Sequence, residues 1–243
     1  MGVLSAKASR FTSAVREAHR DGGSRGALRR MGELAVAAVQ YRGRLFSEWR
    51  FDRRLQIDTR GVVSEKDTVA TTTGHRDGTR YEATRPRDFE RLAKSLPLDA
   101  PPAAYTFIDL GCGKGRVLVL AADHGFGRIV GVEIDDLLVD AARANLLSVQ
   151  ARRGGVLGNV EVVAADAATY TLPLEPLVIY MYNPFGEQTV RDVAENVQRS
   201  WEQCPRPLLV VYYNPVHQHL LDAVPALRRV PSGAEFWSFF RAD

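Results

Sequence analysis

Five apolar runs, each the length of a buried strand, alternate with longer amphipathic stretches from residue 105 onward. The runs cover residues 105–110, 128–133, 160–164, 177–182 and 208–213. Between them the periodicity predicts helices over about 115–124, 136–151 and 187–203. Strands that are apolar at nearly every position are buried on both faces, so the pattern predicts an α/β fold with a parallel sheet built from strand–helix–strand units.

The end of the chain has a different pattern. Residues 226–230 and 235–240 have strand character, and Pro231-Ser232-Gly233 between them has the composition of a tight turn. We therefore expect a terminal hairpin that places one antiparallel strand in the otherwise parallel sheet.

Residues 1–60 predict two helical stretches around a break at residues 21–26. In the second stretch, apolar residues recur at three- and four-residue spacing and form a stripe that we expect to pack on another surface. The stripe consists of Leu28, Met31, Leu34, Ala35, Ala38 and Val39.

Residues 56–80 are rich in Thr, Gly and Asp and lack periodicity, which indicates a loop or lid. A helix is expected from about Pro86, with Phe89 and Leu92 on its apolar face and Pro97 after its end. The domain organisation that follows is a basic helical extension over 1–60, a lid and pre-core helix over 61–100, and a core domain over 101–243.

Length and cysteine content limit the class of protein. A chain of 243 residues suits one sizeable α/β domain with an extension. Cys112 and Cys204 do not form the framework of a disulfide-rich protein, which favours a reducing cytoplasm. Neither an apolar run of about 18 residues nor a signal-peptide pattern occurs, so we expect no transmembrane segment.

Charge is distributed unevenly along the chain. Residues 1–60 hold 13 Lys and Arg against 6 Asp and Glu, a balance of +7, whereas the rest holds 19 against 23, a balance of −4. The basic segment suits nucleic acid, an acidic protein surface or anionic lipid as a partner, or it forms a solvated helical face.

The candidate chemistry begins with a glycine-rich loop, Gly111-Cys112-Gly113-Lys114-Gly115, which follows the first core strand and opens a helix. Glycines let the backbone bend sharply and approach a ligand, and the free amides of a helix N-terminus face that ligand. The loop therefore predicts a pocket for a nucleotide-type molecule, with a tight strand-to-helix turn as the alternative.

Two acidic residues follow the next two strands. Glu133, before Ile134, ends the second strand where a ribose would lie, and a carboxylate can bind both ribose hydroxyls. Asp166, before Ala167, follows the third strand and is expected to accept a hydrogen bond from the amino group of an adenine, or to form an Asx turn.

Spacing separates two classes of cofactor. Dinucleotide binding requires a glycine at the position of Arg116. Proteins that bind a methyl donor instead have an acidic residue before the first glycine of the loop, and Asp109 occupies that position. Together with Glu133 and Asp166, these residues make the region 105–241 resemble the class I methyltransferase family. The resemblance implies S-adenosylmethionine as the cofactor and a Rossmann-like seven-stranded sheet of order 3-2-1-4-5-7-6, with strand 7 antiparallel.

A candidate acceptor site follows the fourth strand, where Tyr182-Asn183-Pro184-Phe185 faces the expected cofactor across the switch point of the sheet. These residues resemble the Asn-Pro-Pro-Phe/Tyr signature of amino-methyltransferases, although one proline is missing. The resemblance implies that Asn183 and a nearby carbonyl accept hydrogen bonds from the target N–H. A second copy, Tyr213-Asn214-Pro215, has the appearance of a turn that ends a strand.

Upstream, Tyr81 precedes the helix expected from Pro86, a layout that loosely resembles the non-SET histone lysine methyltransferases and small seven-strand lysine methyltransferases. The likeness implies a pocket-lining, catalytic Tyr81, and an ordinary core aromatic is the alternative. When residues 51–54 and 58–59 are included in the comparison, the chain as a whole most resembles uncharacterised bacterial members of the class I methyltransferase family.

The sequence thus predicts methyl transfer from S-adenosylmethionine to a nitrogen acceptor, either a protein lysine or other protein amine, or a small-molecule amine. An RNA or DNA base is the alternative acceptor, which the basic residues 1–60 would contact. A nicotinamide-dependent oxidoreductase and a non-catalytic cofactor-binding module are alternatives of other classes. We expect no metal site, because His217 and His219 have no other ligand type at suitable spacing, and no Cys112 nucleophile.

Overall fold

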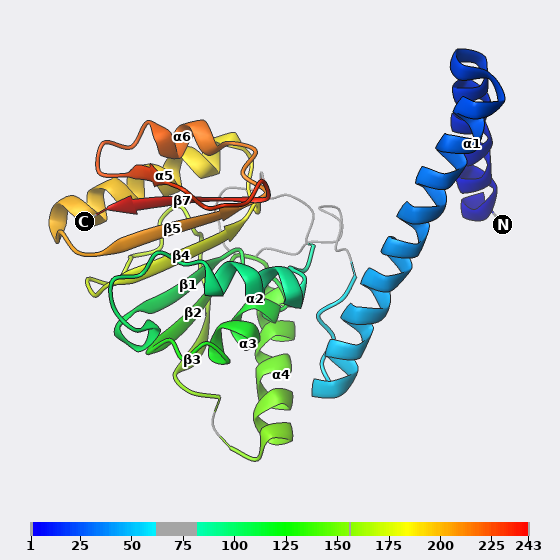
Figure 1. Ribbon diagram of the computed structural model, residues 1–243. Helices are drawn as coiled ribbons and strands as arrows, with labels where there is room; N and C mark the ends of the chain where they lie inside the picture. The colour runs from blue at the N-terminus through cyan, green and yellow to red at the C-terminus, as the bar shows by residue number, and fades with distance from the viewer. Residues whose placement is uncertain (1, 62–81, 156, 243) are drawn as a thin grey trace. The chain divides into compact units, whose positions relative to one another are not determined.

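The computed structural model describes residues 2–61, 82–155 and 157–242 (Figure 1). Contacts between residues divide the chain into two compact units, Met1–Arg50 and Phe51–Asp243. The second unit therefore begins within the segment that the sequence pattern assigned to the N-terminal extension. Among the described residues, no helix is both long enough and apolar enough to cross a membrane.

The first unit is formed by α1 (Gly2–Leu55) up to Arg50. Gly23, with φ 60° and ψ −155°, interrupts the helix and divides it into two arms, inside the break expected at residues 21–26. The arms approach closely, because a Cβ atom on Gly26 would lie 2.5 Å from the carbonyl oxygen of Ala18. Gly23 thus allows the chain to change direction, and Gly26 allows the backbones of the two arms to come into contact.

The apolar stripe of the second arm differs from the expectation. Leu28, Met31 and Val39 are 68%, 45% and 71% exposed, and Phe46 further along the arm is 57% exposed. Within the described residues of the first unit, no packing of the stripe is observed, and the predicted packing partner stays a prediction. Periodicity shows that a helix has an apolar face, and it does not show that the same chain covers that face.

The second unit is built on a seven-stranded sheet with the order β3-β2-β1-β4-β5-β7-β6. The strands are β1 (Thr106–Leu110), β2 (Arg128–Glu133), β3 (Val160–Ala164), β4 (Leu177–Tyr182), β5 (Leu208–Tyr213), β6 (Arg228–Val230) and β7 (Trp237–Ala242). Strands β1 to β5 pair in parallel, and β7 pairs antiparallel with both β5 and β6. The predicted order and the terminal hairpin are confirmed.

Helices cover both faces of the sheet (Figure 1). One face packs against α2 (Pro86–Lys94), α3 (Arg116–Ala122) and α4 (Asp136–Arg153), and the other against α5 (Glu187–Gln203) and α6 (Gln218–Asp222). Along β1, Phe107 points into the first core and Ile108 into the second. Both residues are fully buried, which explains why these strands are continuously apolar in sequence.

The predicted pre-core helix is present as α2, and its Phe89 and Leu92 are fully buried. It ends at Lys94, where the Ser95 hydroxyl donates to the carbonyl of Leu92. Two short elements were not predicted: α6 and the 3-10 helix η2 (Pro102–Ala104). Both are too short to give a periodic signal.

Candidate active site

The glycine-rich loop, Glu133, Asp166 and the Asn183 turn lie at the carboxyl edge of the parallel strands. Leu110 in β1 pairs in register with Val132 in β2 and Met181 in β4. The glycine-rich loop, Glu133 and the Asn183 turn follow these three positions. Because parallel strands end at the same edge, the topology brings the three segments together at the switch point between β1 and β4.

Gly111 connects the loop to the turn after β4. Its φ is +78°, and a Cβ atom there would lie 2.7 Å from the Cβ atom of Pro184 and 3.6 Å from a ring carbon of Phe185. The amides of Gly111 and Cys112 both donate to the carbonyl of Val132. The glycine is therefore required by the backbone conformation and by direct contact with the Asn183-Pro184-Phe185 turn.

The end of the loop, like its beginning, contains a glycine with a positive φ that lies in close contact with a neighbouring element. Gly115 precedes α3 with φ +79°, and a Cβ atom there would lie 3.2 Å from the Cβ atom of Ala142 in α4. Gly113 donates its amide to the carboxylate of Glu133 over 2.9 Å. The loop is thus fixed by α4 and by the acidic residue at the end of β2.

Glu133 is 8% exposed, and its carboxylate also accepts the amides of Ile134 at 2.9 Å and Asp135 at 3.1 Å. Burial raises its pKa, and the three amide hydrogen bonds oppose that shift. Asp135 in turn caps α4 by accepting the amides of Leu137 and Leu138. The side chain at the predicted ribose position is therefore oriented by backbone groups.

Asp109, one position before the end of β1, is 3% exposed. Burial raises its pKa well above the ordinary value, and the nearby charge of Glu133 raises it further. Two carboxyl groups therefore share a buried region beside the glycine-rich loop. Such a region favours a ligand group that carries positive charge.

Cys112 packs between β2 and α3. It is 5% exposed, and a Cβ atom on Gly131 would lie 2.7 Å from its sulfur and 2.6 Å from Leu118. Burial first, and then the charges of Glu133 and Asp109, raise the pKa of the thiol well above its ordinary value. The thiol stays protonated and acts as a small apolar group, which agrees with the expectation that it is no nucleophile.

Asp166 and Ala167 follow β3 at the same edge and are 9% and 6% exposed. The Asp166 carboxylate accepts the amide of Ala168 over 2.9 Å, which is an Asx-type turn. The structure thus contains the Asx turn, which is one of the two roles expected for Asp166. The interaction with an adenine amino group stays a prediction.

Asn183 adopts φ +37°, in the left-handed region that few residue types tolerate. Its side-chain oxygen accepts the hydroxyl of Tyr212 in β5 over 3.2 Å, and the amide of His217 donates to the same hydroxyl oxygen over 3.4 Å. Because the Tyr212 oxygen already accepts from His217, its proton is directed at Asn183. Phe185 is 9% exposed and packs in the core below the turn.

The second Tyr-Asn-Pro copy lies beside the first. Tyr182 and Tyr213 are register partners in β4 and β5, and their rings meet edge to face with centroids 4.7 Å apart. Asn214 follows with φ +51° and is exposed. Both neighbouring strands are therefore followed by an asparagine with a left-handed backbone.

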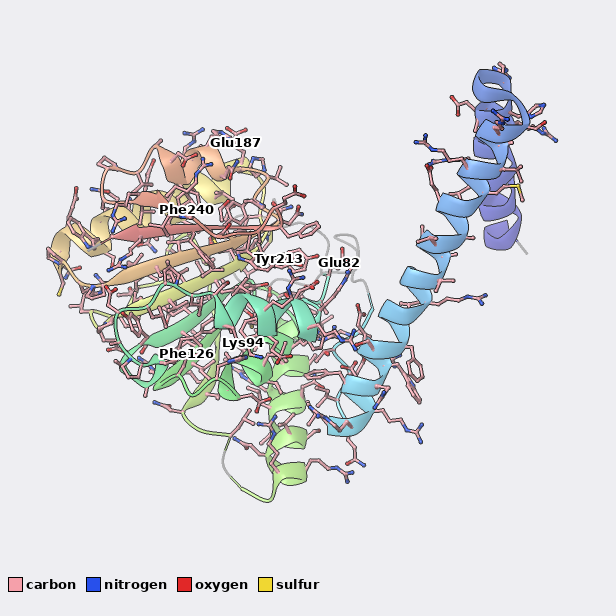
Figure 2. The ribbon with its side chains drawn as sticks, viewed as in Figure 1. Glu82, Lys94, Phe126, Glu187, Tyr213 and Phe240 are labelled. Carbon is pink, nitrogen blue, oxygen red and sulfur yellow. The ribbon has the colours of Figure 1, made fainter. Side chains whose placement is uncertain are left out.

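Aromatic residues continue from this edge toward α2. The Tyr213 ring stacks on Trp237, and its hydroxyl donates to Asp88 in the first turn of α2 over 3.2 Å. Figure 2 shows Tyr213 at the carboxyl end of β5, away from Phe126 at the opposite end of the sheet. Burial and the nearby Asp88 carboxylate raise the pKa of Tyr213, so α2 is held on the sheet by a neutral phenol.

Two groups at this edge were missed as functional candidates. Tyr212 gave no signal because it lies inside an apolar strand. Arg116 was noted only as the residue that replaces a dinucleotide glycine, yet it is 1% exposed and contacts Asp52 and Thr59. The signal in the sequence is that Arg116 is the first residue of an otherwise apolar helix, 116–122, which indicates a buried charge.

Tyr81 lies outside the described residues. His217 and His219 have ring centroids 6.4 Å apart, and among residues 2–61, 82–155 and 157–242 no group of three His, Cys, Asp or Glu side chains is arranged to hold a metal ion.

Comparisons with known proteins match the part of the chain that contains this site. Residues 107–202 match a protein family described as "Methyltransferase domain". The chain is 44% identical over 66 residues to the ribosomal protein L11 methyltransferase of Dechloromonas aromatica (strain RCB), covering 27% of this chain and 19% of the relative. It is 36% identical over 98 residues to a protein-lysine N-methyltransferase of Saccharolobus islandicus (strain REY15A), covering 39% of this chain and 61% of the relative.

The chain thus spans less than two thirds of the length of these relatives. Among solved structures, it is similar to a predicted N6-adenine-specific DNA methylase from Listeria monocytogenes, with a TM-score of 0.46, 15% identity and coverage of 66% of this chain and 51% of the other. The matched region contains the glycine-rich loop, Glu133, Asp166 and Asn183, and the sheet has the order expected from the resemblance. Residues 107–202 thus match a methyltransferase domain, and the sheet that contains them has the strand order expected for class I methyltransferases.

Proposed function

We propose that this protein transfers the methyl group of S-adenosylmethionine to a nitrogen atom of a protein or small-molecule amine. The observation that carries the proposal is the contact between the glycine-rich loop and the Asn183 turn. Pro184 packs against Gly111 so closely that no side chain fits between them. A donor held by the loop would therefore lie next to the carboxamide of Asn183.

For the cofactor, Glu133 would bind the ribose hydroxyls, with Ile134 beside it, and Asp166 with Ala167 would contact the adenine. Gly111, Cys112, Gly113 and Gly115 would surround the methionine part with backbone atoms, and Asp109 would face its positive charge. The raised pKa of Asp109 supports this role, because a buried carboxyl group without a cation is costly to ionise. The sulfonium supplies an activated methyl group.

The chemical step would be an in-line displacement. Bound S-adenosylmethionine would supply a methyl carbon to which the lone pair of the acceptor nitrogen would bond, while the carbon–sulfur electron pair would stay on sulfur to give S-adenosylhomocysteine. The methylated nitrogen then loses its extra proton to water. Asn183 would accept a hydrogen bond from the acceptor N–H through the side-chain oxygen that the Tyr212 hydroxyl contacts. Positioning of this kind can supply much of the rate acceleration without a dedicated base.

The substrate-side groups would be Tyr182, Pro184 and Phe185, and Tyr81 is proposed to line the same pocket. A protein amine is favoured as the acceptor, because both curated relatives named above carry protein substrates in their names. Cys112 and Cys204 are both free, which supports a reducing compartment such as the cytoplasm.

The test compares the wild type with Asn183→Gly. Glycine adopts a positive φ without strain, so this variant keeps the turn and loses only the carboxamide. Isothermal titration should give similar affinities of both proteins for S-adenosylhomocysteine. In a cell lysate with radiolabelled S-adenosylmethionine, the wild type should form S-adenosylhomocysteine and the variant should not. Absence of binding by the wild type would overturn the cofactor assignment, and equal turnover would overturn the role of Asn183.

Treating the lysate with protease or with ribonuclease before the reaction separates the acceptor classes. Loss of labelling after protease treatment supports a protein amine, and labelling that survives both treatments supports a small molecule.

An RNA base is the second candidate acceptor, because residues 1–60 carry a balance of +7. If RNA is the acceptor, labelling is lost after ribonuclease treatment instead. Removal of residues 1–50, which form a separate unit, should then weaken RNA retention in a salt-dependent way.

A further inference from the structure

A cluster of buried polar side chains lies beside the glycine-rich loop, and neither the cofactor nor the acceptor assignment uses it. Its centre is the guanidinium of Arg116, which is 1% exposed. Arg116 donates to the hydroxyl of Thr59 over 2.6 Å, to the carboxylate of Asp52 over 3.4 Å and to the carbonyl of Thr84 over 3.4 Å. The ring of Phe51 lies 5.8 Å from the guanidinium carbon.

Asp52 is the counterion of this cluster and is 2% exposed. One of its oxygens accepts the Thr59 hydroxyl over 2.7 Å, and the other accepts the amides of Thr59 and Arg60 at 3.0 and 3.1 Å. The carboxylate therefore fixes the backbone of residues 59–60 as well as the guanidinium. Burying such a pair costs desolvation energy that apolar side chains of similar volume would not cost. A contribution to stability thus does not explain why the pair is buried. Its directional hydrogen bonds do, because they fix the positions of the guanidinium and of residues 59–60.

The same segment is attached to the loop at two further points. The ammonium group of Lys114 donates to the carboxylate of Asp58 and to the carbonyl of Arg60, each over 3.1 Å. The side chain of Asn145 in α4 donates to the carbonyls of Asp58 and Lys114, each over 3.0 Å, and accepts the amide of Asp58. Residues 52–60, called the brace below, are thus hydrogen-bonded to Lys114 and Arg116, on both sides of Gly115.

We propose that the brace belongs to the cofactor site, and that Asp52 and Arg116 are positioning residues that hold the loop in its binding conformation. Arg116 is the first residue of α3, and Gly115 before it has φ +79°. The orientation of Arg116 therefore sets the direction in which the chain leaves the loop. Asp52 and the brace lie outside the matched region 107–202. The inference rests on the cofactor assignment and is independent of the acceptor.

The central test uses Thr59→Val in the full-length protein. Valine has nearly the same shape as threonine but lacks the hydroxyl that joins Asp52 to Arg116, and it leaves both charges paired. Titration with S-adenosylhomocysteine should give at least about a tenfold weaker affinity, the loss of about 1.4 kcal/mol. The matched control is Arg206→Met. Arg206 is also buried, donates to the carbonyls of Pro173 and Glu175, and precedes β5 at the opposite edge of the sheet.

Arg206→Met should lower the urea midpoint of unfolding and leave the affinity for S-adenosylhomocysteine unchanged. An affinity in Thr59→Val equal to that of the wild type would overturn the proposal, as would equal affinity losses in Thr59→Val and Arg206→Met. A wild type that binds neither S-adenosylmethionine nor S-adenosylhomocysteine would instead show that the cofactor assignment fails, and the inference with it.

A charge-neutral double variant, Asp52→Asn with Arg116→Met, gives a second readout. Asp52→Asn leaves the buried guanidinium of Arg116 without its counterion and should lower the urea midpoint strongly. Arg116→Met should lower it less, because Arg60 still pairs with Asp52 over 3.3 Å. The double variant should regain part of the midpoint, because neither charge remains, but it should not regain the affinity for S-adenosylhomocysteine. Recovery of both quantities together would show that the pair is merely structural.

Discussion

The contact between Gly111 and Pro184 gives a quantitative prediction about the substitution Gly111→Ala. Two costs apply. The residue has φ +78°, and a left-handed conformation costs an alanine about 1–2 kcal/mol. The new methyl group would also lie 2.7 Å from the Cβ atom of Pro184, and overpacking of this kind typically costs about 1–3 kcal/mol. The free energy of unfolding should therefore fall by about 2–5 kcal/mol.

Gly125→Ala separates the two costs. Gly125 has nearly the same φ, +76°, but no atom of the described residues lies within 4 Å of the site of an added Cβ. It should lose only the conformational part, and any change in the entropy of the unfolded chain is common to both variants. Urea denaturation of the two proteins thus measures the contact as a difference of about 1–3 kcal/mol.

Pro184→Gly removes the opposing Cβ atom, so Gly111→Ala should cost less in that background. If Gly111→Ala and Gly125→Ala differ by less than about 0.5 kcal/mol, the loop and the Asn183 turn are not in contact, and the basis of the proposed acceptor site is lost.

Three further predictions concern single side chains. The pKa of Asp109 is higher in the folded protein than in the unfolded chain, so the folded state binds more protons above a pH of about 4, and the free energy of unfolding should fall as the pH rises through the raised pKa. Asp109→Asn should reduce this pH dependence in urea midpoints measured from pH 4 to pH 8. A steeper pH dependence in the variant would contradict the assignment. Tyr212→Phe removes one neutral hydrogen bond to Asn183, worth about 0.5–1.5 kcal/mol, so the rate of methyl transfer should fall roughly 2- to 12-fold while the affinity for S-adenosylhomocysteine stays constant. Glu133→Ala should weaken that affinity roughly 10- to 100-fold, because hydrogen bonds to a charged group are worth about 1.5–3 kcal/mol, and calorimetry that finds no change would exclude Glu133 as the ribose ligand.

The sheet was predictable because its strands are buried on both faces. The limits of β2, β3, β4 and β5 coincide with the apolar runs, since a strand that contacts helices on both sides has no reason to alternate with polar residues. The glycine-rich loop and Glu133 were predictable for another reason. Their backbone conformation and chemistry restrict the residue types that fit, and the strand before each of them fixes its place in the sheet.

The contacts that join distant segments were not predictable. Tyr212 and Asn183 are 29 residues apart, and Arg116 and Asp52 are 64 apart, so no spacing rule connects them. The apolar stripe of α1 illustrates the opposite limit: Leu28 and Val39 lie on the predicted face, but the structure leaves them exposed. A periodic pattern describes one surface of an element, and the partner of that surface is a property of the whole assembly.

The left-handed backbone at Asn183 restricts which residues can stand at the proposed acceptor position. Only Asn, Asp and Gly adopt such a φ readily, and the following proline keeps the chain from relaxing into another turn. Under the proposed function, a new acceptor is thus hard to accommodate by substituting many side chains at position 183. Variation in substrate has to come from residues around that position, such as those of the parallel turn at Asn214, so directed evolution of specificity should begin there.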